Sequence, residues 1–183
     1  PGSSIEGLGE VIAASLVSGA VLHVVHIQST GGPVTSKLLQ MVVASRQRGL
    51  DVTAECYPYT ASMTDISSSI YSPGWREKFD LDYDAMQWGA TGERLTAATF
   101  EKYRKTGGLV VLHSNTEEVV SDSVKDPNTM IASDGLKGHP RNAGTFARLL
   151  GHYVRERKDL DLMQALRKIT LMPAQRLEKR VPG

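Results

Sequence analysis

The residues best suited to chemistry lie between Thr129 and Phe146, where the sequence reads TMIASDGLKGHPRNAGTF. Asp134 follows a short apolar run, and His139 and Arg141 follow it in a loop that contains glycine. A carboxylate at the C-terminal end of a buried strand lies where α/β enzymes keep their reactive groups. An Asp-Gly turn that only closes a strand, followed by an ordinary surface loop, explains the same pattern equally well.

Further candidate site residues lie at the C-terminal ends of three other apolar runs of the chain. They are His26 in the run 21–27, the group Glu55, Cys56 and Tyr57 in the run 51–57, and His113 in the run 109–113. If these runs form parallel strands, their C-terminal ends meet at one edge of the sheet, together with Asp134. An imidazole and a carboxylate that face one pocket can bind a divalent metal or perform acid–base catalysis.

Each candidate also has a purely structural explanation. His23 and His26 are three residues apart on a strand and face opposite sides, and His26 is the better functional candidate because it is nearer the strand end. Glu55 and Cys56 alternate in the same way, so only one of them can face the site, and Cys56 is typical of a small buried residue. His113 is equally well explained as a strand-end residue bonded to the backbone.

Two features could bind an anion. Arg141 suits bidentate recognition of a substrate carboxylate, and a salt bridge to a neighbouring helix is its structural alternative. The pair Gly31-Gly32 before a helix could cradle an anion, although the chain has no full phosphate-loop motif.

The elements that must position these residues alternate along the chain. Apolar spacing predicts helices that begin with caps at Ser3, Thr35, Thr96 and Asn115, helices around 146–154 and 162–169, a last short helix near Pro173, and strands at 21–27, 51–57, 109–113 and 129–133. Such alternation predicts an α/β fold with about four parallel strand–helix units and additional C-terminal helices. Four units form either an open doubly wound sheet or half of an eight-stranded barrel of the (β/α)8 TIM type.

The segment 59–96 follows neither the helical nor the strand period. It contains Ser67-Ser68-Ser69, Pro73-Gly74 and scattered aromatic residues. Long aperiodic segments inside a compact domain are typical of functional loops, so we expect a lid or binding insert within the single domain 1–183.

Composition narrows the class of protein. The 183 residues suffice for one domain with a core. Lys and Arg number 21 and Asp and Glu 20, a balance that favours neither nucleic acid nor an anionic membrane as a partner. Cys56 is the one cysteine, so no intrachain disulfide can form, and we expect a reducing, cytoplasmic location. No apolar run approaches the ~20 residues of a membrane span.

Several segments together resemble one protein family. They are HVVHIQSTGG at 23–32, ECYPYTAS at 55–62, MIASDG at 130–135, HPRNAGTFARLLGHYVRE at 139–156 and LRKITLMPAQRLE at 166–178. In this order and spacing they resemble the D-aminoacylase, or N-acyl-D-amino-acid deacylase, branch of the amidohydrolase superfamily.

The resemblance implies a metal-dependent (β/α)8 barrel that hydrolyses the amide bond of an N-acyl amino acid or a related small molecule. His26 matches the metal ligand after the fifth barrel strand. Asp134 matches the aspartate after the eighth strand, which contacts the metal, expected to be zinc, and acts as general base and acid. Arg141 matches the arginine that holds the substrate carboxylate, and we expect Tyr57 and His139 to contribute to substrate binding.

The chain also departs from the family pattern. It has no counterpart of the His-x-His pair after the first strand, no further ligand from the first half of the barrel, and no small β-sandwich domain. We therefore expect the C-terminal half of a barrel, with strands 21–27 and 129–133 as its edges, covered by self-association or by missing protein. His26 and Asp134 alone are too few ligands for tight metal binding, so little activity is expected. The alternatives are a non-catalytic half-barrel scaffold and a small-anion-binding α/β module.

Overall fold

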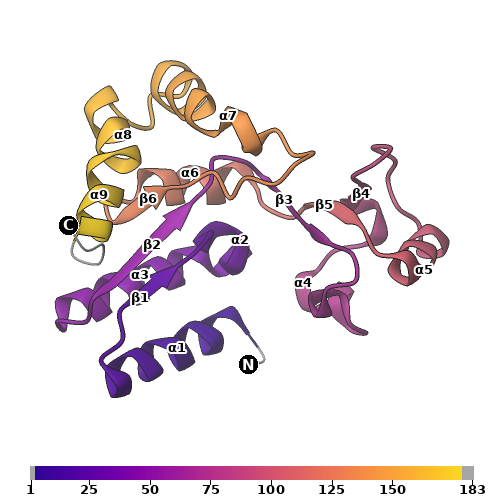
Figure 1. The fold of residues 1–183 in the computed structure, drawn as a ribbon, viewed down its shortest axis with the longest axis horizontal. Coiled ribbons are helices and arrows are strands. Elements are labelled where there is room, and N and C mark those ends of the chain that lie inside the picture. Colours follow the sequence, from indigo (N-terminus) through magenta and orange to yellow (C-terminus); the bar gives the residue numbers. More distant parts are fainter. Residues whose placement is uncertain (1–2, 179–183) are drawn as a thin grey trace.

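A computed structural model describes residues 3–178 and shows two units side by side (Figure 1). The first unit is a parallel sheet with its covering helices. It comprises α1 (Ser4–Ser18), β1 (Leu22–Val24), α2 (Ile27–Gly31), the 3-10 turn η1 (Gly32–Val34), α3 (Thr35–Gln47), β2 (Val52–Cys56), α6 (Glu117–Lys125), β6 (Thr129–Ile131), α7 (Arg141–Arg148), the π-helix η4 (Leu149–Glu156), α8 (Leu162–Ile169) and α9 (Leu171–Glu178).

The second unit lies between β2 and α6 in the sequence and on the side of the molecule away from α8 and α9 (Figure 1). It comprises β3 (Ala61–Asp65), η2 (Ser69–Tyr71), α4 (Trp75–Phe79), η3 (Tyr83–Ala85), β4 (Met86–Trp88), α5 (Ala97–Thr106) and β5 (Leu109–His113). The insert expected at 59–96 is therefore continuous with a larger unit that runs as far as His113.

The parallel sheet has three strands in the order β1-β2-β6. Its register pairs Val24 with Ala54 and Cys56 with Ile131. The expectation that β1 and β6 form the two edges of this sheet is confirmed.

The expectation of a fourth parallel strand at 109–113 was wrong. This segment is β5, which pairs antiparallel with both β3 and β4 in a separate sheet. The sequence LVVLH is apolar enough for a strand in either setting, and its strand period carries no information about the direction of the partner strand.

Aliphatic side chains form the core of the first unit. Val52, Ala54 and Cys56 alternate along β2 and pack against helices α3 and α6, through residues such as Leu38 and Val120. The opposite face of β2 therefore presents the residues between them, Thr53 and Glu55.

Aromatic side chains dominate the core of the second unit. Tyr71, Trp75 and Phe100 are all buried, and the rings of Trp75 and Phe100 stack with centroids 5.5 Å apart. This core is separate from the aliphatic one, so each sheet is stabilised by its own helices.

Two of the four expected helix caps are confirmed. Ser3 and Thr96 each form a capping box at the start of α1 and α5. The cap of α6 is Thr116 and not Asn115. Thr35 is not a cap, because η1 runs directly into α3 and the Thr35 hydroxyl instead donates to the carbonyl of Gly32 at 2.7 Å.

The C-terminal helices α8 and α9 are tied to the sheet by two cations. The buried ammonium of Lys168 donates to the carbonyls of Asp126 and Thr129, and burial lowers the pKa of Lys168. Arg176 donates to the carbonyl of Leu22 at 2.8 Å. Within residues 3–178, no helix has the length and apolar character needed to cross a membrane.

Candidate functional site

The C-terminal ends of the parallel strands carry two residues with unusual backbone geometry. His26 follows β1 with φ 36° and Asp134 follows β6 with φ 45°. Both are non-glycine residues in the left-handed region, a strain of about 1–3 kcal/mol that clusters at functional sites. Because all three strands are parallel, both residues lie at the same end of the sheet. Their strands are two spacings apart, which is about 10 Å.

Asp134 forms an ion pair with Arg141. The Oδ2 atom of Asp134 lies 2.9 Å from Nη1 of Arg141. The Arg141 side chain is 2% exposed and the Asp134 side chain 35%, so the carboxylate lies between a buried guanidinium and solvent.

Two other contacts define the position of the Arg141 guanidinium. Its Cζ atom lies 4.5 Å from the centroid of the Tyr57 ring, a cation–π contact at the end of β2. Its Nη2 atom donates to the carbonyl of Met63 in β3 at 3.4 Å. Within the described part of the chain, Nε of Arg141 is buried and has no hydrogen-bond partner, and Nη1 meets Asp134 as an ion pair without a hydrogen bond of good geometry.

His139 is buried in the loop that leads into α7, two residues before Arg141. Its Nδ1 atom accepts a hydrogen bond from the backbone N–H of Arg141 at 3.0 Å, so the neutral ring carries its proton on Nε2. Burial and the charge of Arg141 lower the pKa of His139. Tyr59 contacts the ring edge to face at 5.4 Å. His139 thus lies in the site as a neutral residue in direct contact with the backbone of Arg141.

Glu55 and Cys56 occupy opposite faces of β2, as their spacing predicted. Cys56 faces the aliphatic core, and burial raises the pKa of its thiol to about 12. Glu55 faces the other side, where its Oε2 atom lies 3.1 Å from Nε2 of His23. The Nδ1 atom of that histidine lies 2.7 Å from Oγ1 of Thr53. Neither Glu55 nor Cys56 joins the Asp134–Arg141 pair.

Sequence reasoning set His23 aside in favour of His26 and missed its pairing with Glu55. The pair faces a cavity of about 420 Å³ that α9 also lines through Pro173 and Leu177. A signal was present in the strand period: His23 lies opposite Thr53, and Glu55, two residues further along β2, faces the same side of the sheet.

His113 does not lie on the parallel edge, contrary to the expectation. It ends β5 in the antiparallel sheet, and its Nε2 atom lies 3.1 Å from Oε1 of Gln87. Burial and the charge of Arg94 lower the pKa of His113. The reason for the error is the misassigned direction of β5.

The described residues do not by themselves complete a metal site. Between residues 3 and 178, no group of three or more His, Cys, Asp or Glu side chains converges. The Nδ1 atom of His26 lies 3.1 Å from Oγ1 of Thr30, which leaves Nε2 for a ligand bond, and Asp134 is engaged by Arg141. Two donors are fewer than the three or four that a bound zinc ion requires from protein.

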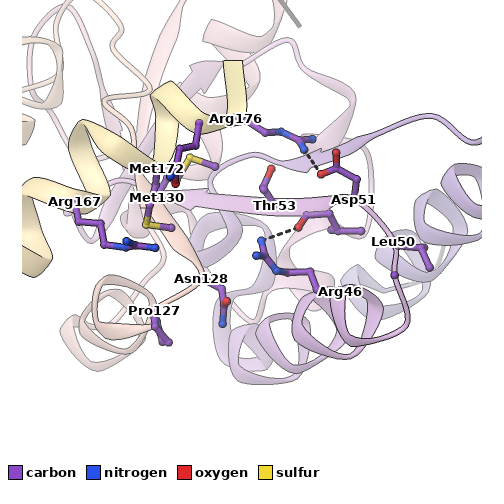
Figure 2. Close-up of a pocket in the computed structure, with 13 residues that line it drawn as sticks. Arg46, Leu50, Asp51, Thr53, Pro127, Asn128, Met130, Arg167, Met172 and Arg176 are labelled. Atoms are coloured by element: carbon purple, nitrogen blue, oxygen red, sulfur yellow. Dashed lines mark hydrogen bonds and ion pairs between the residues drawn. The ribbon is translucent and has the colours of Figure 1, made fainter. Parts of the chain in front are cut away.

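A pocket of about 360 Å³ lies at the opposite, N-terminal end of the strands (Figure 2). Figure 2 shows Arg176 paired with Asp51, and Arg46 donating to the carbonyl of Val52 at 3.2 Å. Met130 and Arg167 also line it. These contacts connect α9 and α3 to the start of β2, so this pocket is separate from the strand ends that carry Asp134.

Comparison with solved structures defines the class of fold. D-aminoacylase, described as defining a novel subset of amidohydrolases, matches with a TM-score of 0.76 and 22% identity over 95% of this chain and 39% of that one. The zinc and phosphonate complex of N-acyl-D-glutamate deacylase from Bordetella bronchiseptica matches with a TM-score of 0.73 and 27% identity, over 92% of this chain and 38% of that one.

Sequence comparison leads to the same relatives. The N-acyl-D-glutamate deacylase of Alcaligenes xylosoxydans xylosoxydans is 31% identical over 149 residues, which covers 71% of this chain and 29% of that protein. No protein-family model matches the chain. The resemblance to the D-aminoacylase branch of the amidohydrolases is confirmed in sequence and in fold, and the chain spans between 29% and 40% of the length of these relatives.

Proposed function

We propose that this chain forms the C-terminal part of a metal-dependent (β/α)8 amidohydrolase that removes the acyl group from N-acyl-D-amino acids. The observation that carries this proposal is the contact between Asp134 and Arg141 at the C-terminal ends of parallel strands. Catalytic groups of (β/α)8 enzymes lie at that end. The similarity to N-acyl-D-glutamate deacylases supports the substrate class.

Asp134 and Arg141 have complementary roles in this proposal. The guanidinium of Arg141, which holds Asp134 in this structure, binds the substrate carboxylate in this proposal. The carboxylate of Asp134 accepts a proton from the attacking water and returns it to the leaving amine. Relatives are described with zinc and with a binuclear metal centre, and His26 and Asp134 would supply part of such a ligand set. Its remaining ligands must come from outside these residues.

The three-stranded sheet changes the proposed barrel numbering. If β6 is the eighth strand, β1 lies two places before it and is the sixth strand, whereas the sequence prediction placed it fifth. The difference arises because β5 belongs to the second unit and does not count as a barrel strand.

The second unit is proposed to act as a cover for the substrate site. Its strand β3 reaches Arg141 directly through the carbonyl of Met63. The Tyr57 ring lies against the same guanidinium, and His139 accepts a hydrogen bond from the backbone N–H of Arg141. A cover held by these contacts would exclude water around the substrate carboxylate, which strengthens its electrostatic recognition.

The open edges of the sheet are the proposed contact surface for the rest of the barrel or for a second copy. Val21 and Val25, on either side of β1, are 49% and 46% exposed. Size-exclusion chromatography with light scattering distinguishes self-association from a monomer. The cytoplasmic location stays a proposal that cell fractionation tests.

Stereoselective hydrolysis tests the proposed function. Zinc-supplemented protein, in the longest form that contains this chain, is assayed with N-acetyl-D-glutamate and with N-acetyl-L-glutamate. We expect release of D-glutamate and at least about tenfold slower release of L-glutamate, a difference of about 1.4 kcal/mol in the barrier. Failure to hydrolyse any N-acyl-D-amino acid would contradict the proposal. The 183-residue chain alone should show little turnover.

A further inference from the structure

We propose that Asp134 serves as an internal ligand of Arg141, and that a small carboxylate displaces it when it binds. The inference rests on the proposed function, because it concerns the same two side chains. It adds that the carboxylate site is already filled before substrate arrives, by the residue that is to transfer the proton.

Burial of Arg141 makes an anionic partner necessary. Its side chain is 2% exposed, and a buried guanidinium without a counter-charge is strongly unfavourable. Asp134 is the one carboxylate within ion-pair distance of Arg141 in residues 3–178. The other contacts of the guanidinium, the Tyr57 ring and the Met63 carbonyl, carry no net charge.

The geometry of the pair leaves room for exchange. An arginine offers five N–H donors, which suit the two oxygens of a carboxylate. Here Asp134 approaches Nη1 with one oxygen at 2.9 Å, and Nε has no partner among the described residues. A free carboxylate is not tethered to the loop, so it can take the place of Oδ2 of Asp134 against Nη1.

The position of Asp134 also allows its side chain to move away from Arg141. Its side chain is 35% exposed, it lies in a strained left-handed conformation, and Gly135 follows it in an exposed loop. Release from Arg141 would free its carboxylate for proton transfer. A substrate that lacks a carboxylate would leave the pair intact, so the exchange selects N-acyl amino acids over N-acyl amines.

Acetate binding tests the exchange without any need for turnover. Acetate affinity is measured by calorimetric titration at pH 7 and constant ionic strength, with sodium chloride as the reference salt, on wild type and on Asp134→Asn. The amide keeps the size of the side chain and removes the competing charge. We expect acetate to bind Asp134→Asn at least about tenfold more tightly than wild type.

Two further variants define the site. Asp122→Asn removes an exposed carboxylate that pairs with Lys125 at 3.1 Å, and it should bind acetate as wild type does. The double variant Asp134→Asn/Arg141→Gln should lose the gain in acetate affinity that Asp134→Asn shows. Because Arg141→Gln changes a buried residue, circular dichroism must first show that the double variant is folded. Asp134→Ala provides an independent measurement: acetate should raise its melting temperature back toward that of wild type.

Equal acetate affinity in wild type and Asp134→Asn, or a gain that persists without Arg141, would overturn the exchange. Neither result depends on catalysis. Absence of hydrolysis in the stereoselective assay would therefore contradict the proposed function. It would not decide the exchange, which the acetate titration tests separately.

Discussion

The two units of the molecule differ in how many strand ends their sheets bring together at one edge. In the parallel unit all strands end at one edge, and that edge carries His26, Asp134 and the start of α7 with Arg141. In the second unit neighbouring strands end at opposite edges, and it reaches Arg141 through a backbone carbonyl, that of Met63. Parallel topology thus gathers reactive side chains, whereas the antiparallel unit contributes a covering surface.

Core truncations should have the largest effects and should separate the two units. Phe100→Ala in the aromatic core should cost about 3–5 kcal/mol and Leu38→Ala in the aliphatic core about 2–5 kcal/mol. If the cores are independent, hydrogen exchange should accelerate in 61–113 for the first variant and in the parallel unit for the second. Acceleration of the whole chain by both variants would show one cooperative core instead.

The contact between the two units can be weakened at Gly144. A Cβ atom at this position would lie 2.6 Å from the Tyr59 hydroxyl, so Gly144→Ala should cost about 1–3 kcal/mol through overpacking. Tyr59→Phe removes that hydroxyl and should recover most of the loss. A double-mutant cycle from urea denaturation measures the coupling, and additive effects would show that the two residues do not clash.

The pH dependence of stability should reflect His139. Burial holds its folded-state pKa below the value of about 6.5 in the unfolded chain. The unfolded state therefore binds this proton more tightly, so stability is retained above pH 6.5 and falls as the pH drops from there toward the lower folded-state pKa. Melting temperatures at pH 7.5 and 5.5 should differ less in His139→Asn than in wild type. An unchanged difference would mean that other groups cause the acid sensitivity.

The smallest effect is expected at an exposed ion pair of the parallel unit. Asp122 and Lys125 lie one helical turn apart at the surface, and Asp122→Asn should change stability by about 0.5 kcal/mol or less. Urea denaturation provides the value, and a loss above about 1 kcal/mol would contradict the view that buried contacts dominate this unit.

Local signals in the sequence predicted local structure well. The helix caps at Ser3 and Thr96 are confirmed, and so are the alternating faces of Glu55 and Cys56. These features depend on residues within one or two turns of one another, which spacing can reveal.

Features that depend on distant partners were not predictable in the same way. The run 109–113 reads as a strand, but its antiparallel direction is set by β3 and β4. Arg141 and Asp134 were both identified, yet their pairing was not, because it depends on how the loop between them folds back. Met63 acts through its carbonyl, which every residue has, so no side-chain pattern could have predicted it.

Two matched carboxylate-to-amide substitutions test most directly whether the chemistry lies at the strand ends. Asp134→Asn changes the residue after β6, and Glu55→Gln changes a residue of β2 that pairs with His23. The rate of N-acetyl-D-glutamate hydrolysis, measured in the longest protein that contains this chain, should fall about 10²–10⁴-fold in Asp134→Asn and stay within a few-fold in Glu55→Gln. A wild-type rate in Asp134→Asn, or a larger loss in Glu55→Gln, would contradict this account.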